Sequence, residues 1–251
     1  GCEMYVLLVA RGYPTERYKT NGIFELDQAK ALVKNGCKVV YAAVDVRSIR
    51  RWRRWGYEYN SVGGLHIHAI NIPVGRIPIP ILQRAIRQGL SILYKKIVDK
   101  HGRPDVLHAH FANFGYAALQ LREKGNIPLV VTEHSSRINQ PAINPRLYSV
   151  AQQVYYKADG LIAVSPTLSE NINKQFGVTP TYIPNVVDVD TFRYQPRKGD
   201  GTFRMVSTGN LINTKRMDLT IEAFHKAFSS NSQVELIIFG EGTKRKELER
   251  S

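Results

Sequence analysis

The chain has 251 residues, of which 43% are hydrophobic and 22% charged, a composition typical of a globular protein rather than a disordered tail. Its formal net charge of +14 favours anionic neighbours such as nucleic acid, an anionic membrane or a phosphate-bearing substrate. Two cysteines, Cys2 and Cys37, are too few for a disulfide framework, and no apolar run approaches the roughly 18 residues of a spanning helix. These features argue against a disulfide-rich secreted domain or a helical membrane protein and predict a reducing, cytoplasmic setting.

A short apolar strand, a loop and an amphipathic helix recur along residues 1–183. Buried strands are predicted at residues 5–10, 38–44, 105–110, 128–132, 161–164 and 181–183. Helices are predicted at residues 21–35, 81–100, 114–124, 146–157 and 166–175, and Asn21 is the expected N-cap of the first. Buried strands that alternate with helices predict an α/β fold with a doubly wound, Rossmann-like parallel sheet. A hairpin with Gly63-Gly64 at its tip is expected within residues 57–72.

Residues 184–201 change character and are predicted to link two domains, because they are polar and lack apolar periodicity. The pattern then restarts, with strands expected at 203–208 and 234–239, a helix at 217–228 and the start of another at 244–249. The roughly 50 residues from 202 to 251 are too few to close a doubly wound domain of ordinary size. We therefore expect an incomplete second Rossmann-like domain.

Several segments, through their order and spacing, resemble the family 4 glycosyltransferases, which are retaining enzymes of the GT-B fold. The segments are N-G-I-F-E-L-D-Q-A-K-A-L-V-K-N-G-C-K-V at 21–39, D-V-L-H-A-H-F at 105–111, V-V-T-E-H-S-S at 130–136, A-D-G-L-I-A-V-S at 158–165, Y-I-P-N-V-V-D-V-D-T-F at 182–192, S-T-G-N-L-I-N-T-K-R at 207–216 and I-I-F-G-E-G at 237–242. The resemblance implies transfer of a sugar from a nucleotide-activated donor, without a metal or other cofactor. The implied acceptor is a polysaccharide, a lipid-linked glycan or a glycolipid in bacterial cell-surface glycan synthesis. The family's donor-binding E-x7-E segment would lie beyond residue 251, so residues 1–251 alone are expected to be inactive.

Asn21 and Gly22 stand after the first strand and open a helix. Free backbone N–H groups and the helix dipole at such a point favour a phosphate, although an ordinary capped helix start explains the same residues. The resemblance implies that Gly22 faces the donor diphosphate and that Asn21, which replaces a second glycine, lines the cleft.

His108 and His110 end a strand as H-A-H and project to the same face, a spacing that invites a zinc site. No third ligand is evident nearby, and the position of a strand end at a cleft explains both residues. We therefore expect His110 to line the cleft and expect no metal.

His134 is the candidate catalytic residue, because it follows a strand at the carboxyl edge where doubly wound folds bind ligands. The resemblance implies that it reaches the transferred sugar, and we expect it to hydrogen-bond and orient that sugar. A histidine that caps the next loop is the alternative. Glu133 is expected to orient the imidazole or to be solvated, and Arg137 is expected to serve the acceptor.

Gly209 and Lys215 follow the first strand of the second domain and match positions that hold the donor diphosphate in the family. Asn210 stands where the family usually has arginine, so one cation is lost. Asp188 and Asp190 form D-x-D, a pattern that elsewhere holds a divalent metal. They lie in the family's interdomain segment, and we expect no metal there.

Residues 46–55 read V-R-S-I-R-R-W-R-R-W, and an anionic membrane is their expected partner. The residues expected to face that membrane are Arg50, Arg51, Trp52, Arg53, Arg54 and Trp55. Nucleic acid and a simple solvated surface are the alternatives. The protein is accordingly expected to be peripheral on the inner face of the membrane.

Two other functions remain open at this point. The positive charge alone suggests a nucleic-acid-binding module, but the sequence carries no recognisable nucleic-acid motif, so we expect no such partner. A GT-B-like nucleotide-sugar epimerase shares the fold and the donor, and products formed without an acceptor would distinguish it.

Overall fold

The computed structural model describes residues 4–50, 53–75, 77–196 and 199–250, and the chain divides into two compact units, Gly1–Phe192 and Arg193–Ser251. The boundary falls within residues 184–201, and the first part of that segment belongs to the first unit. An exposed ion pair between Lys34 and Asp190 connects this part to the first helix.

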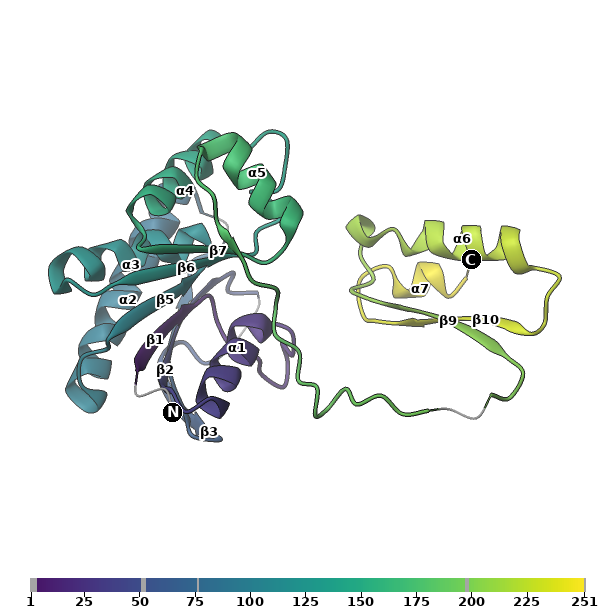
Figure 1. The fold of residues 1–251 in the computed structure, drawn as a ribbon, viewed down its shortest axis with the longest axis horizontal. Coiled ribbons are helices and arrows are strands. Elements are labelled where there is room, and N and C mark those ends of the chain that lie inside the picture. The colour runs from purple at the N-terminus through teal and green to yellow at the C-terminus, as the bar shows by residue number, and fades with distance from the viewer. Residues whose placement is uncertain (1–3, 51–52, 76, 197–198, 251) are drawn as a thin grey trace. The chain divides into compact units, whose positions relative to one another are not determined.

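One mixed sheet forms the centre of the first unit (Figure 1). Its strands are β1 (Tyr5–Ala10), β2 (Lys38–Arg47), β3 (Gly56–Val62), β4 (Leu65–Pro73), β5 (Val106–His110), β6 (Leu129–Glu133), β7 (Gly160–Ala163) and β8 (Thr181–Tyr182). Their order is β3-β4-β2-β1-β5-β6-β7-β8, and all neighbours are parallel except β3 and β4. The helices are α1 (Ile23–Lys34), α2 (Ile79–His101), α3 (Ala112–Gly125), α4 (Pro145–Lys157) and α5 (Pro166–Phe176). The predicted α/β class and parallel sheet are confirmed.

Alternate residues of the central strands supply two cores, one on each face of the sheet. Leu7 and Val9 of β1 pack with α2, α3, α4 and α5, whereas Val6 and Leu8 pack on the face that α1 covers. Figure 1 shows this division, with α1 apart from the other four helices. Burial on both faces explains why the strands appear in the sequence as continuous apolar runs. Because helices cover both faces of the sheet, a ligand-binding site is expected at its carboxyl edge.

Two local predictions differ from the structure. The N-cap of α1 is Gly22, not Asn21, because residue 22 has a φ of 71°, which glycine adopts readily. Strand β2 continues to Arg47, three residues past its predicted end, because it pairs with β4 as far as Pro73. The extension places Asp45 and Arg47 at the carboxyl edge. The predicted hairpin is confirmed, with Gly63 and Gly64 between β3 and β4.

The second unit contains β9 (Phe203–Thr208), the 3-10 turn η1 (Asn213–Lys215), α6 (Met217–Phe228), β10 (Val234–Phe239) and α7 (Arg245–Leu248). Strands β9 and β10 pair in parallel and leave Phe203 and Phe239 at least 60% exposed. Glycine is required at Gly240, since a Cβ there would lie 1.9 Å from the carbonyl oxygen of Gly209. These elements are the start of a second Rossmann-like pattern.

Cys37 takes part in a disulfide bond. The other cysteine, Cys2, lies outside the described residues. Among the helices of the described chain, none is both long and apolar enough to cross a bilayer.

Candidate functional site

A cavity of about 600 Å³ opens at the carboxyl edge of the first unit's sheet, and we call it the cleft pocket. The ends of four strands contribute to it: Arg11 follows β1, Arg47 ends β2, Phe111 follows β5 and His134 follows β6. Of the residues predicted from the sequence, the pocket brings together Asn21, Glu133, His134 and Arg137. A volume of this size suits a sugar or another small polar ligand.

Three histidine rings form a stack that runs from His134 in the pocket wall into the interior. His108 and His110 lie on β5 with ring centroids 4.9 Å apart, and His110 and His134 lie 5.1 Å apart. His110 Nδ1 and His134 Nε2 are 2.8 Å apart and share a hydrogen bond, while His108 Nε2 is 2.8 Å from Thr132 Oγ1. His110 is fully buried, so it supports His134 from behind instead of lining the pocket.

All three rings are neutral at pH 7. Burial lowers the pKa of His108 to about 4 and, with Arg11 nearby, the pKa of His134 to about 4. Burial, followed by the neighbouring His108 and His134, holds the pKa of His110 well below its usual range. The Asn185 side chain raises the pKa of His134, but this effect is smaller than the lowering by burial. A neutral imidazole can donate or accept a hydrogen bond to a sugar hydroxyl, and it adds no positive charge to the pocket.

Glu133 organises the loop that carries His134. Its Oε1 accepts the backbone N–H groups of His134 and Ser135 at 3.1 and 2.9 Å, and its Oε2 accepts the N–H of Ala112 and the hydroxyl of Tyr155 at 2.9 and 2.8 Å. Burial raises the pKa of this carboxyl and outweighs the lowering effect of these bonds. Because Glu133 is fully buried, the expectation that it is solvated is wrong; it positions the backbone after β6.

Aromatic rings and Arg11 surround the exposed side of His134. The Phe24 ring stacks at 6.1 Å, and the Phe111 ring lies at 5.1 Å. Phe111 has a φ of 68°, which a residue with a side chain rarely adopts and which commonly marks a functional site. The Arg11 guanidinium lies 4.6 Å from the Phe111 centroid, and its Nε donates to Glu25 at 3.1 Å.

The turn that precedes α1 depends on two glycines. A Cβ on Gly22 would lie 2.3 Å from the Gly12 carbonyl oxygen, and a Cβ on Gly12 would lie 2.2 Å from Asn21 Nδ2. Asn21 donates to Asp45 Oδ2 at 3.3 Å and so connects this turn to β2. Gly22 therefore permits close packing of the turn, and its part in holding a diphosphate stays a prediction.

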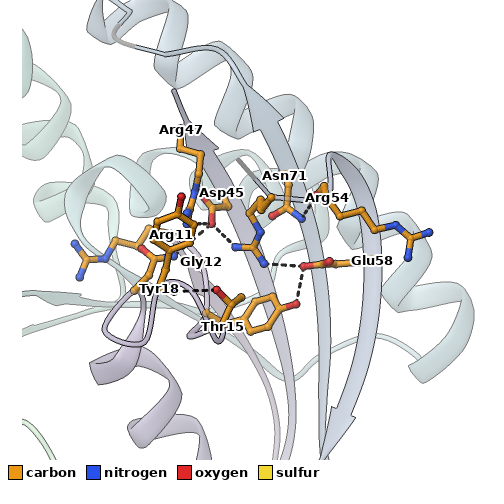
Figure 2. Close-up of polar contacts among 12 residues, drawn as sticks. Arg11, Gly12, Thr15, Tyr18, Asp45, Arg47, Arg54, Glu58 and Asn71 are labelled. Carbon is orange, nitrogen blue, oxygen red and sulfur yellow. Dashed lines mark hydrogen bonds and ion pairs between the residues drawn. The ribbon is translucent and has the colours of Figure 1, made fainter. Parts of the chain in front are cut away.

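A buried ion-pair network extends from the pocket into the hairpin (Figure 2). Asp45 accepts Arg47 Nε at 2.7 Å and Arg53 Nη1 at 2.6 Å, and Arg53 Nη2 continues to Glu58 at 2.8 Å. Tyr13 also donates to Glu58, at 2.6 Å. Buried carboxylates with several donors hold their partners in fixed geometry, so Arg47 is presented to the pocket with little freedom.

The structure separates the arginines of the basic stretch. Arg53 is only 7% exposed and is bound in the network, so the prediction that it faces a membrane is wrong. Arg50 and Arg54 are exposed, and Figure 2 shows Arg54 pointing away from the network. Trp55 is half-buried, and Arg51 and Trp52 lie outside the described residues.

Gly209 and Lys215 belong to the second unit. Gly209 follows β9 and donates its N–H to Phe239 at 3.0 Å, and Lys215 is the exposed last residue of η1. Arg216 forms an exposed ion pair with Asp218 at 2.9 Å.

Among the described residues, no group of three or more His, Cys, Asp or Glu side chains is arranged to hold a metal ion. Asp188 instead accepts the hydroxyl of Thr191 at 2.7 Å and the N–H of Asp190 at 3.1 Å.

Sequence reasoning missed Arg11, Phe24, Asp45, Arg47 and Phe111, all of which line the cleft pocket. Arg11 and Phe111 directly follow predicted strands, so the rule that ligands bind beyond the carboxyl ends of strands could have found them. Asp45 and Arg47 escaped because the end of β2 was placed three residues too early.

The family described as Glycosyltransferase Family 4 matches residues 24–191, which is more than half of the chain. A glycogen synthase of Mycobacterium tuberculosis is 27% identical over 64% of this chain and 41% of that protein. A putative teichuronic acid biosynthesis glycosyltransferase of Bacillus subtilis is 26% identical over 76% of this chain and 51% of that protein. A phosphatidyl-myo-inositol mannosyltransferase of M. tuberculosis is 29% identical over 66% of this chain and 46% of that protein. The chain thus spans about half the length of these curated relatives.

Solved structures share the fold at low sequence identity. The catalytic domain of starch synthase IV from Arabidopsis thaliana, bound to ADP and acarbose, matches with a TM-score of 0.66 and 13% identity, covering 99% of this chain and 71% of that one. Sucrose-phosphate synthase from Thermosynechococcus elongatus matches with a TM-score of 0.59 and 14% identity, covering 94% of this chain and 71% of that one. At such identities the likeness shows the fold alone.

Proposed function

The chain belongs to glycosyltransferase family 4, and on that basis we propose that the whole protein transfers a sugar from a nucleotide-activated donor with retention of anomeric configuration. The observation that carries the proposal is the cleft pocket, which places His134 at the carboxyl edge of the sheet where donor sugars are expected. The names of the similar proteins support a glycan or lipid-linked acceptor.

In this proposal His134 binds and orients the donor sugar as a neutral hydrogen-bonding group. Its Nε2 is committed to His110, whereas its buried Nδ1 has no hydrogen-bond partner in the described chain and is therefore the nitrogen that would meet a sugar hydroxyl. Glu133 fixes the loop backbone through its four hydrogen bonds, so the imidazole needs little reorganisation when the sugar arrives.

The reaction breaks the bond between the sugar C1 and the diphosphate oxygen and forms a bond between C1 and an acceptor oxygen. The acceptor proton passes to an oxygen of the departing diphosphate, and no metal or further cofactor enters the proposal. Gly209 and Lys215 of the second unit would bind that diphosphate, and Gly22 would pack near it. Arg137 lines the pocket without an ion-pair partner in the described chain and suits an acceptor that carries negative charge.

Incubating the whole protein with nucleotide sugars and candidate acceptors tests this proposal. We expect free nucleotide diphosphate together with a glycoside whose anomeric configuration, read by proton NMR, equals that of the donor. An inverted product would contradict retention, and an altered nucleotide sugar formed without acceptor would support the epimerase. Duplex DNA binding with a steep salt dependence, in the absence of donor binding, would favour the nucleic-acid module.

We further propose that the protein is peripheral on the inner, cytoplasmic face of an anionic membrane and that the exposed part of residues 46–59 contacts it. Of the residues predicted to face the membrane, Arg50, Arg54 and Trp55 remain suitable among those described, because Arg53 is buried. Arginines near a charged leaflet contribute about 1 kcal/mol each, so the pair supplies modest, salt-sensitive attraction.

The double variant Arg50→Ser/Arg54→Ser is therefore expected to lose roughly tenfold or more of its binding to anionic vesicles, in line with about 1 kcal/mol per arginine. Vesicle co-sedimentation at low and high salt measures this loss, with phosphatidylcholine vesicles as the neutral reference. Lys95→Ser/Lys124→Ser removes the same charge from exposed sites on α2 and α3 and should bind like the unmodified protein. Equal losses in both variants would mean that net charge, not this stretch, attracts the membrane.

A further inference from the structure

A second cavity of about 450 Å³ lies among α2, α3 and α4 and is separate from the cleft pocket; we call it the basic groove. Successive positions of α2 divide between the two cavities: Leu82 and Ile86 face the cleft pocket, whereas Gln83, Arg84 and Arg87 line the basic groove. Tyr116 of α3 and Arg146 of α4 complete its polar lining. No step of the proposed transfer uses these residues.

The charges of the groove are uncompensated. Arg84, Arg87 and Arg146 line it, and the described lining contains no Asp or Glu. Within the described chain, no ion pair or hydrogen bond engages their guanidinium groups, although most arginines of the cleft pocket have a carboxylate partner. Three mutually repelling cations around one cavity favour an anion that neutralises them.

The position of Arg146 adds to this excess. It is the second residue of α4, after the N-cap Asn144 and Pro145, and the first turn of that helix contains no acidic residue. A cation at this position opposes the helix dipole, so it does not serve helix stability. The dipole and the guanidinium instead create positive potential at the same point.

A buried amide in the wall of the groove indicates a ligand independently of the charges. Gln83 is only 5% exposed; its Nε2 donates to Asn113 at 2.6 Å, but its Oε1 is buried without a hydrogen-bond partner. Buried carbonyl oxygens rarely stay unsatisfied in the absence of ligand or water. Since Oε1 can only accept, the partner it fits is a donor such as a hydroxyl.

From these observations we propose that the basic groove binds a phosphate ester that carries a free hydroxyl group. The guanidinium groups of Arg84, Arg87 and Arg146 bind the phosphate, and Gln83 Oε1 accepts the hydroxyl. Such a group belongs both to soluble polyol phosphates and to the headgroup of a phospholipid such as phosphatidylglycerol. The proposal does not depend on the transferase activity.

The proposal is tested by titrating the 251-residue chain with sn-glycerol 3-phosphate. Binding is measured by calorimetry and by the NMR signals of the Gln83 carboxamide. We expect saturable binding that shifts the Gln83 signals, and binding about tenfold weaker or worse in Arg84→Ser/Arg87→Ser, because each charge-assisted hydrogen bond is strong. The control Lys95→Ser/Lys124→Ser, which removes equal charge outside the groove, should bind normally. Absence of saturable binding, or equal affinity in the groove variant, would overturn the proposal.

Two further measurements sharpen the result. Gln83→Leu should abolish any preference for glycerol phosphate over inorganic phosphate, and an unchanged preference would remove Gln83 from the site. Lys215→Ser should leave the Gln83 shifts intact, which separates this site from the donor site proposed in the second unit. Phosphatidylglycerol vesicles then identify the source: competition between vesicles and glycerol phosphate assigns a lipid headgroup, and its absence assigns a soluble phosphate ester.

Discussion

Replacing His134 with alanine is expected to lower turnover in the whole protein about a hundredfold or more while the fold persists. A hundredfold loss corresponds to about 2.7 kcal/mol of transition-state stabilisation, which is typical for one well-placed hydrogen-bonding group. His134 lies partly exposed in the wall of the cleft pocket, so its removal leaves the two cores of the sheet intact. Steady-state kinetics with circular dichroism as a fold check measures the effect.

Two conservative variants identify the ring nitrogen that acts. Asparagine places its amide near the position of Nδ1, whereas glutamine places it near Nε2. Because Nε2 is bound to His110, His134→Asn should retain more activity than His134→Gln. Wild-type kinetics in a folded His134→Ala protein would remove this residue from the site, and a loss confined to KM would assign it to ground-state binding.

Acid is expected to destabilise the first unit by several kcal/mol between pH 6.5 and 4. The pKa values of His108 and His134 are lowered to about 4 in the folded protein, so the unfolded chain binds more protons in this interval. The stability that depends on neutral rings is therefore fully present above pH 6.5 and is lost as the pH falls toward 4. Each of these two rings accounts for about 3 kcal/mol of the lost stability, since one unit of pKa difference between the folded and unfolded states corresponds to about 1.36 kcal/mol.

That loss is large beside the roughly 5–15 kcal/mol that holds a typical domain folded. Urea unfolding at a series of pH values gives the slope, and NMR titration of individual histidine rings shows which residues cause it. His68 on β4, whose pKa burial also lowers to about 4, acts in the same direction and must be resolved separately. Titration of His108 and His134 near pH 6.5 in the folded protein would contradict the expectation.

The local pattern of residues was sufficient to predict the helices, the strands and the fold class. Apolar runs such as Tyr5–Ala10 alternate with amphipathic helices. A strand that is buried on both faces of a parallel sheet needs apolar residues at every position, so such strands can be recognised in the sequence alone. Gly63-Gly64 predicted the hairpin because only a few residue types adopt positive φ at both positions of a tight turn. The order and spacing of the motifs identified the family, because these motifs lie at strand ends, where the fold brings distant segments together.

Contacts between distant segments decided the role of individual side chains. Arg53 and Arg54 are neighbours in a uniformly basic stretch, yet Asp45 and Glu58 bury the first, and the second is left exposed. Glu133 lines the cleft pocket as predicted, but donors from α3, α4 and its own loop surround its carboxylate. Burial and ion pairing depend on residues far apart in the chain, and a pattern of neighbours carries no information about them. The three-dimensional arrangement was therefore needed to separate the residues that can reach a ligand from those that hold the site in place.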